Sequence, residues 1–137
     1  MSNLVVPDVG KKPRIQALLD APNYKTVHLF KNNATVDHNT VLADLTEADF
    51  SGYASITLSG GTVQSLLDAS RRAVTLWNMV SWTKSGATGN TIYGYYYKNN
   101  AGDLTGVEKW DSPETMTTDG QVLQFVPQDT EGSQFSN

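Results

Sequence analysis

Residues 91–98 carry the feature that most narrows the folds open to this chain. They read Thr-Ile-Tyr-Gly-Tyr-Tyr-Tyr-Lys, and tyrosine and isoleucine favour β-strands. Residues 99–103, Asn-Asn-Ala-Gly-Asp, are typical of a turn, and residues 104–110 form a second strand-like run. The pattern predicts a β-hairpin over residues 91–110. Gly94 inside the first strand indicates a bulge or a close approach of another backbone.

Other short runs of strand-forming residues recur along the chain, with turn-forming residues every 8–12 positions. They predict strands at 24–30, 53–58, 73–77, 80–84 and 121–126. In the first of these, Val27 and Leu29 are expected on one face and Thr26 and His28 on the other. Residues 62–72 fit a helix or a strand equally well. The fold class is therefore mostly β, an antiparallel β-sandwich of the jelly-roll type.

One or two short helices are expected beside these strands. Residues 11–20 place apolar side chains at helical spacing, with Pro13 near the start. Thr46 and Asp49 resemble a capping box, which predicts one helical turn at 46–49. Residues 111–113, Asp-Ser-Pro, are predicted to form a turn.

The length of 137 residues suits one compact domain. We expect an extended arm at 1–10, a single β-sandwich domain at 11–127 and a frayed polar tail at 128–137.

Composition excludes several classes of function. The net charge is −4 and no basic cluster is present, which argues against nucleic acid as a partner. No run of about 18 apolar residues occurs, so no membrane span is expected. The chain has no cysteine, which excludes disulfides, thiol nucleophiles and zinc–thiolate sites. The N-terminus lacks the pattern of a secretory signal, so synthesis in a cytoplasm is expected.

Catalytic and metal-binding patterns are weak. His28 and His38 lie without partner ligands at a recognisable spacing, and we interpret both as surface histidines. Carboxylates gather at 44–49 and at 108–114, where Asp49 is explained by capping and Asp111 by turn formation. We therefore expect neither an enzyme nor a cofactor, with a small glycosidase as a remote alternative.

The tyrosines of the first hairpin strand are the most unusual feature. In a regular strand Tyr93, Tyr95 and Tyr97 share one face. Three uses of such a row remain open: packing within the sandwich, contact with another subunit, or stacking against sugar rings.

Several segments together resemble small virion proteins of tailed bacteriophages. They are the Leu-Val-Val-Pro arm at 4–7, residues 27–33, Leu-Thr-Glu-Ala-Asp-Phe-Ser-Gly-Tyr at 45–53, residues 92–96 and residues 120–125. The family includes capsid cement, or decoration, proteins with a jelly-roll-like sandwich. The resemblance spans residues 4–127 and rests on turns and strands.

The resemblance implies a non-enzymatic protein on the outer surface of the capsid. Such a protein binds the major capsid protein, stabilises the shell and commonly forms a homo-oligomer. Leu4, Val5 and Val6 of the arm, with Tyr93, Tyr95 and Tyr97, are the expected contact residues. Two alternatives remain: a tail, baseplate or receptor-binding sandwich, and a carbohydrate-binding module that uses the tyrosine face.

Overall fold

The structure is a computed structural model, and it describes residues 26–37, 39–59, 62–67 and 73–131. Its elements are β1 (Thr26–Phe30), the 3-10 helix η1 (Leu42–Asp44), β2 (Ile56–Thr57), β3 (Thr62–Leu67), β4 (Ala73–Leu76), β5 (Val80–Thr83), β6 (Asn90–Lys98), β7 (Leu104–Met116), β8 (Val122–Phe125) and β9 (Gln128–Glu131). Every strand pairing among them is antiparallel. The prediction of a mostly β, antiparallel chain is confirmed.

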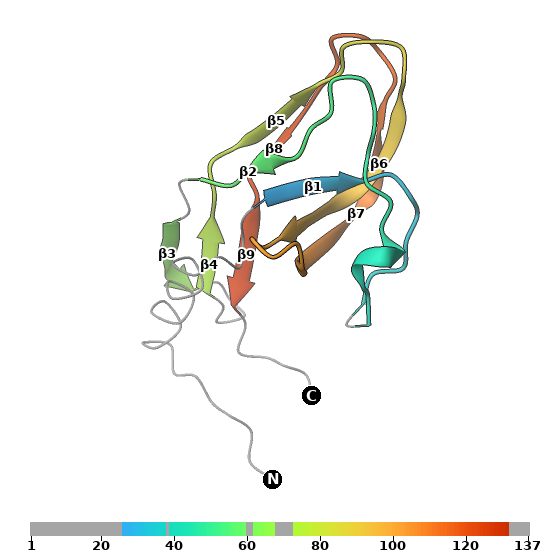
Figure 1. The fold of residues 1–137 in the computed structure, drawn as a ribbon. Coiled ribbons are helices and arrows are strands. Elements are labelled where there is room, and N and C mark those ends of the chain that lie inside the picture. The colour runs from blue at the N-terminus through green and yellow to red at the C-terminus, as the bar shows by residue number, and fades with distance from the viewer. Residues whose placement is uncertain (1–25, 38, 60–61, 68–72, 132–137) are drawn as a thin grey trace.

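The strands form three hydrogen-bonded groups (Figure 1). A four-stranded sheet has the order β2-β1-β6-β7, a three-stranded sheet has the order β3-β4-β9, and β5 and β8 form a two-stranded ribbon. The hairpin predicted at 91–110 is present. Its turn is closed by the amide of Asn99, which donates to the carbonyl of Asp103 at 3.0 Å.

The main hydrophobic core lies between the four-stranded sheet and the β5–β8 ribbon. Val27 and Leu29 of β1 point into it, as predicted, and Trp82 reaches it from β5. A second, smaller cluster on the opposite face of the sheet contains Phe30, Leu45 and Tyr96. Both faces of β1 and β6 are therefore covered, which explains why Phe30 is apolar although it lies on the face opposite Val27 and Leu29.

A bulge in β7 overturns the prediction for the tyrosine row. Ile92 pairs with Glu114 and Gly94 with Lys109, so the four residues 110–113 stand opposite Tyr93 alone. This irregularity breaks the alternation of β6. Tyr93 packs against the second cluster, while Tyr95 and Tyr97 are 3% exposed in the main core. The expectation that the three share one face is wrong, and Tyr95 and Tyr97 are core residues in this structure.

The helical turn predicted at 46–49 is also wrong, because this segment is extended and lies along β1. The amide of Ala48 donates to the carbonyl of Leu29 at 2.9 Å, and the amide of Lys31 donates to the carbonyl of Thr46 at 2.8 Å. Ala48 and Phe50 are buried while Asp49 between them is exposed. Burial of every second side chain requires an extended backbone.

Three further predictions change. The predicted turn at 111–113 lies within β7, as part of its bulge. Residues 128–131 of the predicted frayed tail form β9, which pairs with β4 through backbone hydrogen bonds that do not depend on side-chain polarity. Residues 62–67 of the ambiguous segment form β3. The arm at 1–10 with Leu4, Val5 and Val6, and the helix at 11–20, lie outside the described residues.

Candidate functional site

A polar network joins β1 to the extended segment beside it. His28 lies on the face of β1 opposite the main core, and its Nδ1 is 2.7 Å from Oε2 of Glu47. Its Nε2 is 2.8 Å from Oγ1 of Thr26. The hydroxyl of Tyr53 donates to the same Glu47 oxygen at 2.7 Å and accepts the amide of Leu29 at 3.1 Å. Glu47 therefore ties together two aromatic side chains from different segments.

The electrostatics of this network fix its proton positions. Burial tends to raise the pKa of Glu47, but the hydrogen bonds from His28 and Tyr53 outweigh it, and the pKa is lowered. Glu47 is thus an acceptor at neutral pH, and Nδ1 of His28 carries the proton that it accepts. Burial also raises the pKa of Tyr53, which keeps its hydroxyl protonated as a donor.

The prediction that His28 is a surface histidine is wrong. The residue is 7% exposed, and its ring stacks on Tyr96 with centroids 4.9 Å apart. Thr26, His28 and Glu47 are joined in the order hydroxyl, imidazole, carboxylate, which is the order of the three groups in the catalytic triad of a serine hydrolase. Because the imidazole ring is buried, a substrate has little access to it. We therefore assign the network a structural role, in which its hydrogen bonds hold residues 46–53 against β1. His38 lies outside the described residues.

We expect Glu47→Gln to lower the free energy of unfolding by about 1–2 kcal/mol at pH 7, because two hydrogen bonds lose their charged acceptor. The lowered pKa of Glu47 stabilises the folded state above the ordinary value of 4.5, and this contribution disappears as the pH falls through the folded pKa. The difference between wild type and variant should therefore shrink below about pH 4.5. Urea unfolding at pH 7, 5 and 3.5 measures it. The exposed Asp111→Asn serves as control, and a difference independent of pH contradicts the assignment.

The carboxylate clusters seen in the sequence have separate structural roles. Asp49 is not a helix cap, because its carboxylate lies 3.0 Å from Nζ of Lys31 and also accepts from the side-chain amide of Asn90. Glu108 accepts the hydroxyl of Tyr95 at 2.6 Å. Within the described ranges, no three histidine or carboxylate side chains gather as metal ligands.

A surface that the sequence did not single out is the outer face of the β5–β8 ribbon. Burial alternates along both strands, so one face enters the core and the other is exposed. We define the outer face by six exposed residues: Met79, Ser81, Thr83, Val122, Gln124 and Val126. None of the six is charged, and three are apolar. The alternation could have been found in the sequence, but the large exposure of Met79 could not.

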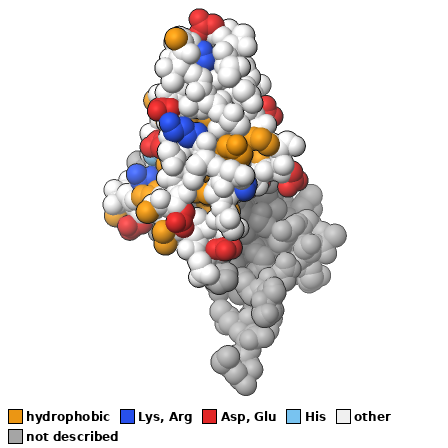
Figure 2. All heavy atoms as spheres, turned by 90° about the vertical axis from the view of Figure 1, so that its right-hand side faces the viewer, with side chains coloured by type: hydrophobic (Ala, Val, Ile, Leu, Met, Phe, Trp, Pro, Cys, Tyr) orange, Lys and Arg blue, Asp and Glu red, His pale blue; other side chains and the backbone are white. Residues whose placement is uncertain are grey.

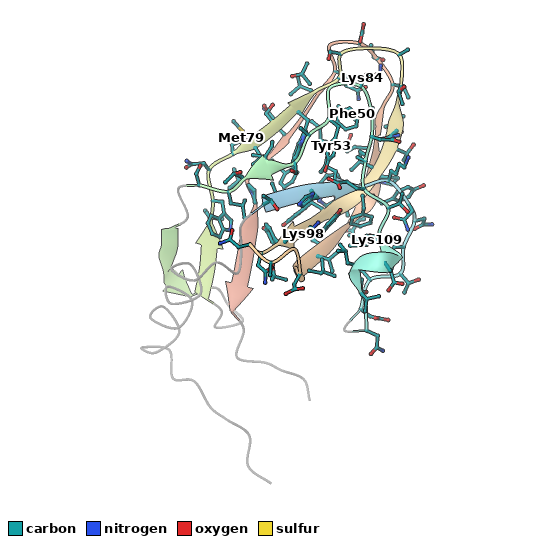
Figure 3. The ribbon with its side chains drawn as sticks, in the orientation of Figure 1. Phe50, Tyr53, Met79, Lys84, Lys98 and Lys109 are labelled. Atoms are coloured by element: carbon teal, nitrogen blue, oxygen red, sulfur yellow. The ribbon has the colours of Figure 1, made fainter. Side chains whose placement is uncertain are left out.

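The face visible in Figure 2 has a different character. Acidic and basic side chains are scattered over it, with hydrophobic side chains between them. Figure 3 places Met79 and Lys109 on opposite sides of the molecule. The outer face of the ribbon is therefore distinguished by its lack of charge, and we take it as the candidate contact surface.

No family model, no curated protein and no solved structure matches this chain. Among the described residues, no helix has the length and apolar character needed to cross a membrane. A function has to be inferred from the surfaces described above and from the resemblance in the sequence.

Proposed function

We propose that this protein is a non-enzymatic structural protein of a tailed-bacteriophage virion, acting as a capsid cement or decoration protein. It is made in the host cytoplasm and binds the major capsid protein on the outer surface of the shell. The resemblance over residues 4–127 suggests the class of protein. The uncharged outer face of the β5–β8 ribbon is the observation that carries the proposal, because it supplies a surface suited to such a contact.

An uncharged face suits repeated binding to a shell. Burying charged side chains in an interface removes their hydration and is favourable only with well-matched partners. Interface centres are accordingly depleted in charged residues and enriched in apolar ones. Met79, Val122 and Val126 provide apolar area, and the hydroxyls of Ser81 and Thr83 form hydrogen bonds at small desolvation cost.

One edge of the four-stranded sheet favours docking by a face over pairing of strands. β7 forms this edge, with β2 at the other, and it carries Lys109, Asp111, Pro113 and the four-residue bulge. Charges, proline and bulges on an edge all discourage a further strand from pairing there. The β7 edge is therefore a poor site for strand pairing with the capsid, in contrast to the uncharged outer face of the ribbon.

In this proposal the β5–β8 ribbon and the four-stranded sheet are the two layers of a sandwich of the jelly-roll type. The support is the main core, which fills the space between them with side chains from β1, β6, β5 and β8. Capsid surfaces are symmetric, so we expect the protein to act as a homo-oligomer.

Val122→Asp tests the outer face, with Val41→Asp as its matched control. The two valines are 51% and 55% exposed, and Val41 precedes η1 at a position where aspartate is tolerated. We expect wild type and Val41→Asp to saturate shells assembled from the phage's major capsid protein. Binding of Val122→Asp should be at least about tenfold weaker, because a charge enters the contact. Cosedimentation and gel densitometry measure bound copies per shell.

Two results count against the proposal. If wild type does not pellet with intact shells, the cement role is wrong, and a tail or receptor-binding position becomes the better hypothesis. If wild type pellets and Val122→Asp binds equally well, the protein binds the capsid through another surface.

A further inference from the structure

A hollow of about 220 Å³ lies between β7 and β8. It is lined by residues from both strands: Trp110, Ser112, Glu114, Leu123, Gln124 and Phe125. Three of them, Trp110, Ser112 and Glu114, belong to the β7 bulge or directly follow it. The hollow thus coincides with the largest irregularity in the β6–β7 pairing.

The strand pairings explain why the hollow exists. β8 pairs with β5 and β7 pairs with β6, while β7 and β8 are not neighbours in any sheet. The four-residue bulge at 110–113 moves the chain out of the ladder at this seam. Bulges commonly redirect side chains beside binding sites. Here the bulge brings Trp110 to the rim of the ribbon, close to Phe125.

The aromatic side chains of the hollow are held in a fixed arrangement. Trp110 and Phe125 meet edge to face, with centroids 5.5 Å apart and ring planes at 81°. Tyr95 supports both, at 4.7 Å from Phe125 and 6.2 Å from Trp110. Trp110 and Phe125 are only partly buried, so some aromatic surface stays open. A rigid aromatic surface binds apolar C–H groups without losing side-chain entropy.

Polar residues complete the lining. Glu114 brings a carboxylate acceptor, Gln124 an amide and Ser112 a hydroxyl. A ligand that matches needs an apolar face and hydroxyl groups at its margin, and a pyranose ring has both. We propose that this hollow binds one ring of a neutral saccharide.

The volume of the hollow and the charge of its lining restrict the class of ligand further. Sites for drug-sized ligands usually measure about 300–1,000 Å³, so a hollow of 220 Å³ suits a single ring better than an extended oligosaccharide. Glu114 is the one charged residue among the six that line it. Its carboxylate repels uronic acids and phosphates, which favours a neutral sugar. The hollow shares Gln124 with the outer face of the ribbon, whereas Trp110, Ser112 and Glu114 of β7 lie outside that face.

Nuclear magnetic resonance of the tryptophan indole N–H groups tests the inference. The chain has three tryptophans, and Trp110→Phe identifies the signal of Trp110 by its disappearance. The probes are methyl glucoside, methyl galactoside, methyl mannoside and N-acetylglucosamine, with glucuronate as the anionic comparison. We expect at least one neutral sugar to shift the Trp110 signal saturably, with a Kd of about 1 mM, and to leave Trp77 and Trp82 unmoved.

Substitutions at exposed lining residues complete the test. Glu114→Ala and Gln124→Ala should each weaken binding by about fivefold or more, since each removes a partner for a sugar hydroxyl. Ser81→Ala, on the outer face of the ribbon but outside the hollow, should leave the Kd unchanged. The inference is overturned if no neutral sugar shifts Trp110 at about 50 mM, if glucuronate binds equally well, or if the lining variants bind like wild type. Capsid cosedimentation of the Glu114 variant, whose substitution lies outside the outer face, separates such a failure from failure of the capsid proposal.

Discussion

Replacing Gly94 by alanine is expected to lower the free energy of unfolding by about 3 kcal/mol or more. A Cβ at this position would collide with the backbone carbonyl oxygen of Glu108 and would lie 2.8 Å from two ring carbons of Phe30. Both obstacles are held in place, because Gly94 pairs with Phe30 on β1 and with Lys109 on β7. Overpacking in a core usually costs about 1–3 kcal/mol, and a collision with backbone belongs at the upper end.

Gly102→Ala is the matched control for this prediction. Gly102 has φ of +87°, but an added Cβ meets no atom within 4 Å. Its substitution should lower the free energy of unfolding by about 1 kcal/mol, through backbone strain alone. Thermal unfolding should place Gly94→Ala about 10 °C below wild type, with Gly102→Ala much closer to it. Equal effects at the two glycines would show that lack of space at Gly94 is not the cause.

Phe50→Ala is expected to lower the free energy of unfolding by about 3–5 kcal/mol. This is as large an effect as truncation of a buried phenylalanine in a regular strand. Phe50 belongs to neither a helix nor a strand, yet it is 2% exposed and packs against Tyr53 with centroids 5.4 Å apart. Its removal leaves a cavity in the main core and loosens the segment that carries Glu47. Chemical denaturation measures the fall in the free energy of unfolding, with the same m-value for wild type and variant.

Val41→Ala provides the comparison for Phe50. Val41 lies in the same connection between β1 and β2 but is exposed, so its truncation should change stability by about 0.5 kcal/mol or less. A small effect at both positions would mean that the connection contributes little to the core.

The strands could be predicted because their signal is local. Val27 and Leu29 alternate with Thr26 and His28, and the Tyr-rich strand is followed by a turn built from Asn99 and its neighbours. Each of these patterns lies within a few residues and follows the geometry of an extended backbone. The close approach expected at Gly94 is confirmed as well, since glycine in a strand has few other uses.

The errors arose where a distant part of the chain decides the local structure. Thr46 and Asp49 suit a helix cap, but hydrogen bonds to β1 hold their segment extended. Asp111 and Pro113 are typical of a turn and do leave the ladder, although β7 resumes pairing beyond them. The contact of His28 with Glu47 joins residues 19 positions apart, and no spacing rule predicts it. The outer face and the hollow depend on the same tertiary arrangement.

The position of β1 between β2 and β6 has a consequence for how the chain reaches its native state. The hairpin of β6 and β7 closes over a short turn, whereas β1 is roughly 60 residues away from β6. Loop closure over that distance is slower and makes the late docking of β1 the natural order of folding. At about 5–20 residues per second, β1 leaves the ribosome about 3–14 s before β6 is complete. During that time β1 lacks the partners that β6 supplies on its longest pairing, so newly made chains are most prone to aggregate before the hairpin forms.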